Sequence, residues 1–145
     1  MDITHEIKLI NYIEANLKRP FAWGECDCNV YALDVIDAVF DTKLAGLIRG
    51  KYKTERGAIR FRKRSAWGSF IELLKEAGFV QGKKGFEQTG DILIVEDPRK
   101  WELVHIYLGK RTVAAFPDEG VLQFPTALIK DKSYTVWRYS PCLPQ

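Results

Sequence analysis

The sequence has little that would indicate a secreted or membrane-spanning protein. It contains 145 residues and only three cysteines, an odd, low count for an extracellular disulfide scaffold. No apolar run approaches the roughly 20 residues that a membrane-spanning helix needs. The N-terminal stretch, MDITHEIKLI, carries acids where a secretory signal would carry basic residues. We therefore expect a chain that is made and folded in a reducing cytoplasm.

What the sequence does contain is typical of a globular protein. Hydrophobic residues make up 46% of the chain and charged residues 28%, which excludes the disordered and fibrous classes. No internal repeat, low-complexity tract or linker interrupts it. A chain of this length can bury a core of its own, so we expect one domain over residues 1–145.

The residue spacing changes character along the chain. Apolar residues at helical spacing predict helices over residues 4–17, 27–40, 54–64 and 66–77. After Gly78, short runs rich in β-branched and aromatic residues predict strands within residues 90–97, 101–109, 111–116, 120–124 and 133–140. The order predicts an α+β fold in which N-terminal helices pack on a C-terminal antiparallel sheet.

Positive charge is concentrated in one segment, although the net charge is only +3. Between Arg49 and Arg64, eight of sixteen residues are Lys or Arg, and Glu55 is the only acid. One interpretation is an ordinary solvated face. The other is a patch for an acidic partner, such as nucleic acid, an anionic polymer or an acidic protein surface.

Cys28 lies where the helix over residues 27–40 is expected to begin. Asp27 is a favourable N-cap residue, which makes Cys28 the first helical residue. The helix dipole and the unpaired backbone N–H groups at that end favour a thiolate, and the same groups could bind an oxyanion. Cys28 is therefore a candidate nucleophile, while the alternatives are a metal ligand and a small buried residue.

A thiolate nucleophile usually needs a base, and His5 and His105 are the two histidines. We interpret His5, near the N-terminus, as a surface residue. His105 falls inside an expected strand, which is a rigid place from which to present an imidazole. The alternative for His105 is a half-buried side chain bonded to a backbone carbonyl.

A metal site is the remaining alternative for the cysteines, with Cys26, Cys28, His105 and Cys142 as its ligands. Structural zinc sites place two to four residues between paired cysteines, but one residue separates Cys26 from Cys28. We therefore expect neither a metal nor a cofactor.

Several segments resemble the NlpC-type branch of the papain-like cysteine peptidases. The shared features are Asp27-Cys28 at a helix start, Gly90-Asp91 at a strand start, and Tyr107-Leu108-Gly109 at a strand end. The segments FAWGECDCNVYALDVIDAV, RGKYKTERGAIR, TGDILIV and VWR are more similar still to an uncharacterised family encoded in tailed phages and prophages, often among tail-assembly genes. This resemblance covers roughly residues 10–139.

The resemblance implies a papain-like fold and, in the bacterial enzymes, hydrolysis of an amide in a peptidoglycan stem peptide. Carried over to this chain, it makes Cys28 the nucleophile, the backbone N–H of Cys28 an oxyanion donor, and His105 the candidate base. Asp27, Trp23 and Gly24 are the candidate binding residues; Trp23 and Gly24 are expected to shape the loop before the site, with Trp23 mainly a packed aromatic.

The base is displaced relative to the family pattern. In the enzymes the strand reads His-Val-Gly-Ile-Tyr-Leu-Gly, so counting back from Gly109 places the base at Leu103. His105 stands two residues later, which keeps the same strand face but moves the side chain by about 6.6 Å. A β-bulge could restore the position.

The residue that should orient the base is also missing from the pattern. It is expected near Ala114 and Ala115, whose side chains offer no hydrogen bond. Gln123 and Glu102 are the fallback candidates.

Two functions follow from these features. One is a phage tail protein, at the tail tip or in tail assembly, whose papain-like domain is mainly structural. The other is an active cysteine peptidase that opens peptidoglycan during DNA entry. Both imply location in the virion and contacts with other tail proteins or peptidoglycan, and neither implies a membrane or nucleic acid as a partner.

Overall fold

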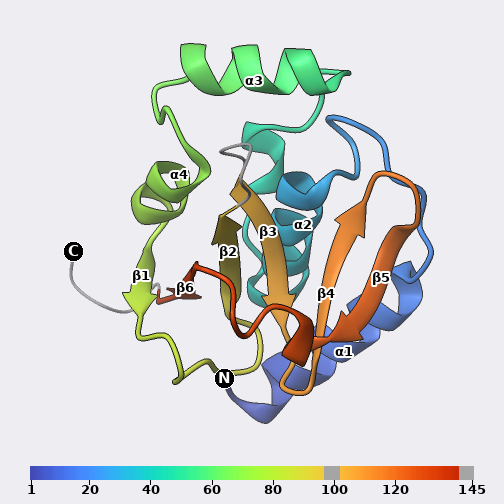
Figure 1. The fold of residues 1–145 in the computed structure, drawn as a ribbon, viewed down its shortest axis with the longest axis vertical. Coiled ribbons are helices and arrows are strands. Elements are labelled where there is room, and N and C mark those ends of the chain that lie inside the picture. Colours follow the sequence, from blue (N-terminus) through green and yellow to red (C-terminus); the bar gives the residue numbers. More distant parts are fainter. Residues whose placement is uncertain (97–101, 141–145) are drawn as a thin grey trace.

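The computed structural model describes residues 1–96 and 102–140, and within them the chain begins with helices and ends with strands (Figure 1). The helices are α1 (Ile3–Asn16), α2 (Cys28–Phe40), α3 (Glu55–Arg64) and α4 (Phe70–Glu76), with 3₁₀ turns η1 (Ala45–Leu47) and η2 (Thr126–Leu128). None of the helices in these ranges is long and apolar enough to cross a membrane.

The strands form one antiparallel sheet. They are β1 (Phe79–Gly82), β2 (Ile92–Glu96), β3 (Glu102–Tyr107), β4 (Arg111–Phe116), β5 (Gly120–Pro125) and β6 (Tyr134–Tyr139), in the spatial order β1-β6-β2-β3-β4-β5. The α+β class and the antiparallel sheet are thus confirmed.

The two faces of the sheet have different cover. Side chains alternate along a strand, so Ile92 and Ile94 of β2 join the main core with α2, whereas Leu93 and Val95 join a smaller apolar cluster on the opposite face. Figure 1 shows α2 behind the sheet in this view. We call the face against α2 the inner face and the other the outer face.

Strands β3 and β4 separate from one another along their length. Their ladder consists of Ile106↔Val113 and Tyr107↔Thr112, although both strands continue beyond these pairs. Figure 1 shows the two ribbons close at the turn that joins them and apart at their other ends. The sheet is therefore split where β3 begins and β4 ends.

Two sequence expectations need correction. The helix expected over residues 66–77 begins only at Phe70, because Gly68 has a positive φ of 72° and Ser69 is the N-cap, accepting from the Glu72 N–H. Strand β1 was not expected, because its four residues are too few to show an alternating pattern. β1 joins the sheet by pairing with β6.

Candidate functional site

Cys28 is the first residue of α2, as the sequence predicts. Asp27 caps the helix: its backbone is extended, and its Oδ1 accepts from the Val30 N–H at 2.9 Å. The Cys28 side chain is half-buried. The local sequence therefore places a thiol at a helix N-terminus, as a nucleophile would require.

Asp27 is occupied by structural hydrogen bonds. Its side chain is buried, and its Oδ2 accepts from the Gly24 N–H at 2.9 Å and from the Tyr52 hydroxyl at 2.6 Å. Gly24 has a φ of +79°, and a Cβ there would lie 1.9 Å from the Tyr52 carbonyl oxygen. Asp27 and Gly24 thus fix the loop before α2 against Tyr52.

Trp23 lies at the edge of that loop. It lines the same pocket as Cys28 and packs edge-to-face against Phe21, with ring centroids 4.9 Å apart. Packing and pocket lining are therefore both roles of this side chain.

His105 lies in the middle of β3, with its side chain on the outer face. It pairs with Leu93 of β2, and only 4% of its surface is exposed. Its ring contacts Phe116 and Phe124, at centroid distances of 6.0 and 5.4 Å. Its Nδ1 atom is buried without a hydrogen-bond partner.

The split in the sheet brings Cys28 to the backbone of β3. The backbone of Tyr107 exchanges hydrogen bonds with Gly90 and Asp91, on the β2 side of β3. Successive residues of a strand direct their backbone groups to opposite neighbours, so Val104, three residues before Tyr107, directs its N–H and C=O toward β4. Beyond the last ladder pair these groups face the split, and the Val104 backbone acts there to lower the pKa of the Cys28 thiol. Cys28 and His105 thus flank Val104 from two sides.

One pocket of about 290 Å³ contains both side chains on its wall. Its other lining residues are Phe21, Trp23, Asp27, Asn29, Tyr52, Glu55, Ala58, Arg62, Glu102, Leu103, Ala115, Phe116 and Pro117. We call it the Cys28 pocket. Its volume is just below the lower limit of about 300 Å³ for small-ligand sites.

The displaced register of His105 is not corrected by a bulge. β2 and β3 pair residue for residue from Ile92↔Ile106 to Glu96↔Glu102. The position two residues earlier, where the resemblance places a base, holds Leu103, which lines the Cys28 pocket as well.

None of the expected orienting residues bonds to His105. Glu102 directs Oε1 to the Phe70 N–H at 3.2 Å and lies 3.7 Å from Arg62 Nη1, which ties β3 to α3 and α4. Ala114 and Ala115 are buried and carry no polar side-chain atoms, and Gln123 pairs with Val113. The orphaned Nδ1 is the direct consequence.

Burial sets the protonation states of the pair. It raises the pKa of the Cys28 thiol to about 12, and the Asp27 carboxylate adds to this, while the Val104 backbone and Arg62 oppose it. Burial also lowers the pKa of His105 to about 4, against a smaller effect of the Val104 backbone. Burial thus opposes the thiolate that the helix N-terminus favours, because desolvation disfavours the charged form of the thiol.

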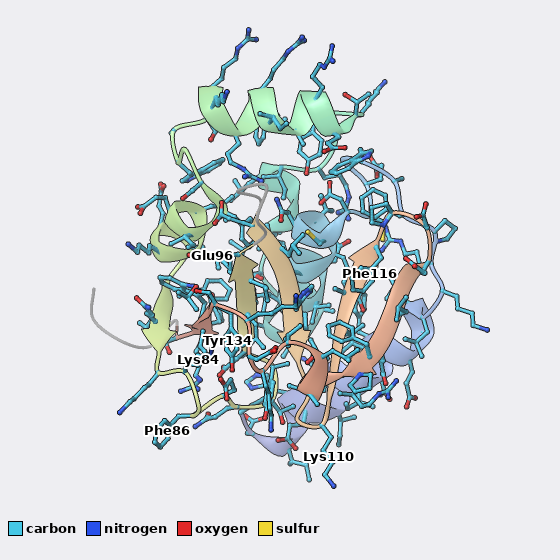
Figure 2. The ribbon with its side chains drawn as sticks, in the orientation of Figure 1. Lys84, Phe86, Glu96, Lys110, Phe116 and Tyr134 are labelled. Carbon is cyan, nitrogen blue, oxygen red and sulfur yellow. The ribbon has the colours of Figure 1, made fainter. Side chains whose placement is uncertain are left out.

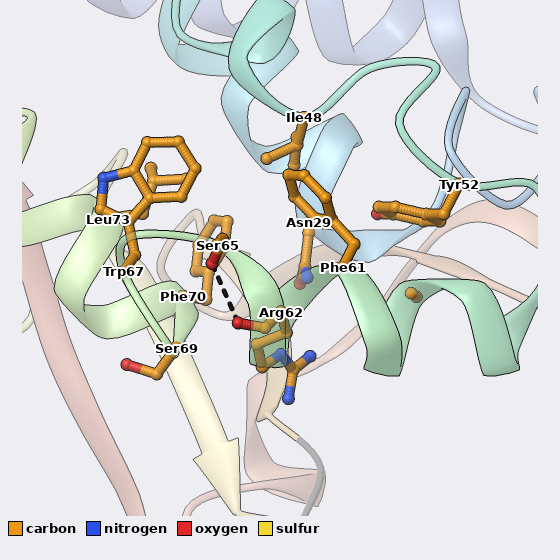
Figure 3. Close-up of a pocket in the computed structure, with 11 residues that line it drawn as sticks. Asn29, Ile48, Tyr52, Phe61, Arg62, Ser65, Trp67, Ser69, Phe70 and Leu73 are labelled. Carbon is orange, nitrogen blue, oxygen red and sulfur yellow. Dashed lines mark hydrogen bonds between the residues drawn. The ribbon is translucent and has the colours of Figure 1, made fainter.

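A second, smaller cavity adjoins the Cys28 pocket under α3. It holds about 30 Å³, which is enough room for a bound water molecule. Figure 3 shows Tyr52, Phe61 and Ile48 on one side of it and Trp67, Phe70 and Leu73 on the other. No short motif in the sequence indicated that Tyr52 or Arg62 would reach this region.

The basic segment divides in the structure. Arg62 points inward from α3 to Glu102, whereas Arg56, Arg60, Lys63 and Arg64 are exposed on the same helix. The patch is thus the solvent side of α3, without Arg62.

Among the residues that the structure describes, those considered for a metal do not form one cluster. Cys26 is buried in the main core, His105 is on the outer face, and Cys142 lies outside the described residues. Within residues 1–96 and 102–140, no cluster of three or more His, Cys, Asp or Glu side chains could hold a metal ion.

A family model matches most of the chain. Residues 2–138 match a family model described as a domain of unknown function (DUF6950). No curated protein matches the chain.

Proposed function

Because this chain belongs to the DUF6950 family, whose description names no activity, we propose from its site and its sequence that it is a phage tail protein with an NlpC-type papain-like domain. Its main role is structural, at the tail tip or in tail assembly, with catalysis secondary. It is made in the host cytoplasm and carried in the virion, in contact with other tail proteins.

The observation that favours a structural over a catalytic role is the resting state of the Cys28–His105 pair. A papain-like dyad works as a thiolate beside an imidazolium, which needs a thiol pKa far below the free value of about 8.5. Here the pKa values are shifted the opposite way, to about 12 for Cys28 and about 4 for His105. Both groups are neutral at pH 7, and His105 has no orienting partner.

A second candidate function is cysteine-dependent hydrolysis of peptidoglycan stem peptides. It is favoured by the shared pocket and by the position of Cys28 at the start of α2. Cys28 Sγ would bond to the amide carbon while its proton passes to His105 and then to the leaving amine as the C–N bond breaks. Water would then hydrolyse the thioester. His105 would have to come within about 3 Å of the thiol proton.

The pH dependence of Cys28 alkylation tests the proposal. Iodoacetamide labelling, resolved by peptide mapping, is measured in wild type and His105→Ala, with buried Cys26 as an internal comparison. We expect a Cys28 profile that rises only above the free thiol value and is the same in both proteins. An apparent pKa well below about 8.5 that rises without His105 would overturn it.

Digestion of purified peptidoglycan completes the same experiment. The proposal predicts equal, background release of new amines by wild type and Cys28→Ala. Release by wild type alone would establish the second candidate instead.

A further inference from the structure

The wall that α3 supplies to the Cys28 pocket is only lightly packed. Of the ten residues of α3, Ala58 alone is buried, whereas seven of the thirteen residues of α2 are buried. Figure 2 shows several side chains with nitrogen ends on the outward side of α3, pointing away from the sheet. Burial of apolar surface is the main force that holds a helix to its domain. We therefore expect α3 to be held more weakly than α2.

Two cavities lie against the inner side of α3. The Cys28 pocket, of about 290 Å³, is lined by Glu55, Ala58 and Arg62 of this helix. The smaller cavity, of about 30 Å³, is lined by Ala58, Phe61 and Arg62. Side chains that border a cavity lose the dispersion contacts of a close-packed interface. The helix thus covers space over part of its length instead of packing on the core.

The chain on either side of α3 has points at which it could turn. Gly68, after the helix, has a φ of +72°, and a Cβ there would meet no atom within 4 Å. Before the helix, Tyr52 is buried and hydrogen-bonded to the cap of α2, but the next two residues are exposed. Hinges are often loop residues that absorb a change in φ and ψ. Residues 53–67 can therefore move while Tyr52 stays in place.

An ion pair joins α3 to the sheet. Arg62 Nη1 lies 3.7 Å from Glu102 Oε1 at the start of β3, and the two side chains are 21% and 17% exposed. Ion pairs that water can reach contribute little to stability. This contact positions the closed helix but holds it only weakly.

Away from the domain, α3 would not persist as a helix. It has ten residues, and isolated helices shorter than about 12–15 residues are marginal in water. Its N-cap is Thr54, whose Oγ1 accepts from the Gly57 N–H at 2.9 Å. The cap therefore stabilises the docked form and contributes little once the segment has left the pocket.

We propose that residues 53–67 form a lid over Cys28, and that the closed form in the structure exchanges with an open form in which α3 has undocked and unfolded. Opening removes Glu55, Ala58 and Arg62 from the pocket wall, so that small molecules reach the thiol. Water admitted with them reverses the burial that raises the pKa of Cys28. The lid controls access to Cys28 whether or not the thiol is catalytic, so it does not rest on the proposed function.

Removal of two matched helix caps tests the lid. Thr54→Ala removes the cap of α3, and Ser69→Ala removes the cap of α4, which accepts from the Glu72 N–H at 3.2 Å. Neither residue lines the Cys28 pocket. The rate of Cys28 labelling by iodoacetamide is measured at one pH, with Cys26 of the main core as the reporter of global unfolding.

We expect Cys28 to be labelled about fivefold faster in Thr54→Ala than in wild type, because an average N-cap changes the opening equilibrium by about that factor. Ser69→Ala should leave the rate close to that of wild type. Labelling of Cys26 should stay slow in all three proteins. Equal acceleration of Cys28 by both variants would overturn the lid.

Amide hydrogen exchange measures the opening directly. In wild type the α3 amides should exchange faster than those of α2, and Thr54→Ala should speed α3 exchange by the same factor as Cys28 labelling. Protection of α3 equal to that of α2 would exclude opening, and faster α3 exchange without faster labelling would exclude a gate over the thiol. A dependence of the thiol pKa on His105 would bear on the proposed function alone, because these variants keep His105 and are compared at one pH.

Discussion

At the scale of single residues, environment decides chemistry more than residue type. Cys28 and His105 are the two residues that a cysteine hydrolase would use, and they reach one pocket. Burial desolvates both groups, and the imidazole also packs against the rings of Phe116 and Phe124. Desolvation favours the neutral form of both, so the pair rests uncharged.

The depressed pKa of His105 makes a prediction about stability. Between the unfolded pKa of about 6.5 and the folded value of about 4, the unfolded chain binds the proton and the folded chain does not. Stability contributed by neutral His105 is therefore complete above pH 6.5 and falls as the pH drops toward 4, by about 3 kcal/mol.

Urea unfolding at pH 7, 6, 5 and 4 measures this loss. His105→Phe keeps an aromatic ring against Phe116 and Phe124. Its free energy of unfolding should fall by about 3 kcal/mol less than that of wild type between pH 7 and pH 4. The same change in the free energy of unfolding with pH in the two proteins would contradict a buried, neutral imidazole.

At the scale of elements, two motifs of the resemblance meet in one contact. Asp91, just before β2, is buried and accepts from Arg138 of β6 through both carboxylate oxygens, at 2.8 Å from Nε and 2.7 Å from Nη2. Its Oδ2 also accepts from the Gln88 N–H at 2.8 Å. This bidentate pair joins the neighbouring strands β2 and β6. The Gly-Asp motif that contains Asp91 and the VWR motif that contains Arg138 therefore have a structural role.

Loss of this pair should destabilise the sheet. Asp91→Asn removes the counter-charge of the partly exposed Arg138 guanidinium, and we expect a decrease in the free energy of unfolding of about 2 kcal/mol. The measurement is chemical denaturation followed by circular dichroism. Asp131→Asn removes the same charge from an exposed residue and should cost less than about 0.5 kcal/mol; similar losses in both variants would count against the pair.

At the scale of the whole molecule, positive charge and the candidate site lie near one another. The exposed cations of α3 face solvent, while Glu55, Ala58 and Arg62 of the same helix line the Cys28 pocket. Figure 1 places α3 at the end of the molecule beyond the split in the sheet. A partner bound through this charge would cover that end.

Reversal of the α3 charge should weaken binding to an anionic partner without unfolding the protein. We expect Arg60→Glu/Lys63→Glu to elute from heparin at lower salt than wild type, with stability changed by about 0.5 kcal/mol per site at most. Lys110→Glu/Lys130→Glu makes the same change in net charge at two exposed residues elsewhere. Equal elution shifts in the two double variants would refute a localised patch.

The sequence alone determined the features that depend on neighbours along the chain. The start of α2 at Cys28 follows from the Asp27 cap, and the α+β class follows from helical spacing before Gly78 and strand composition after it. Caps and periodicity act over a few residues, so they can be read directly. For the same reason the four-residue β1 was missed.

Only the tertiary structure decided the chemical state of the site. The Tyr52–Asp27 hydrogen bond joins residues 25 positions apart, and the continuous β2–β3 register leaves His105 two residues from the expected base position. The thiol and imidazole pKa values depend on how much water packing removes. Desolvation belongs to the assembled core, and no local pattern in the sequence encodes its size.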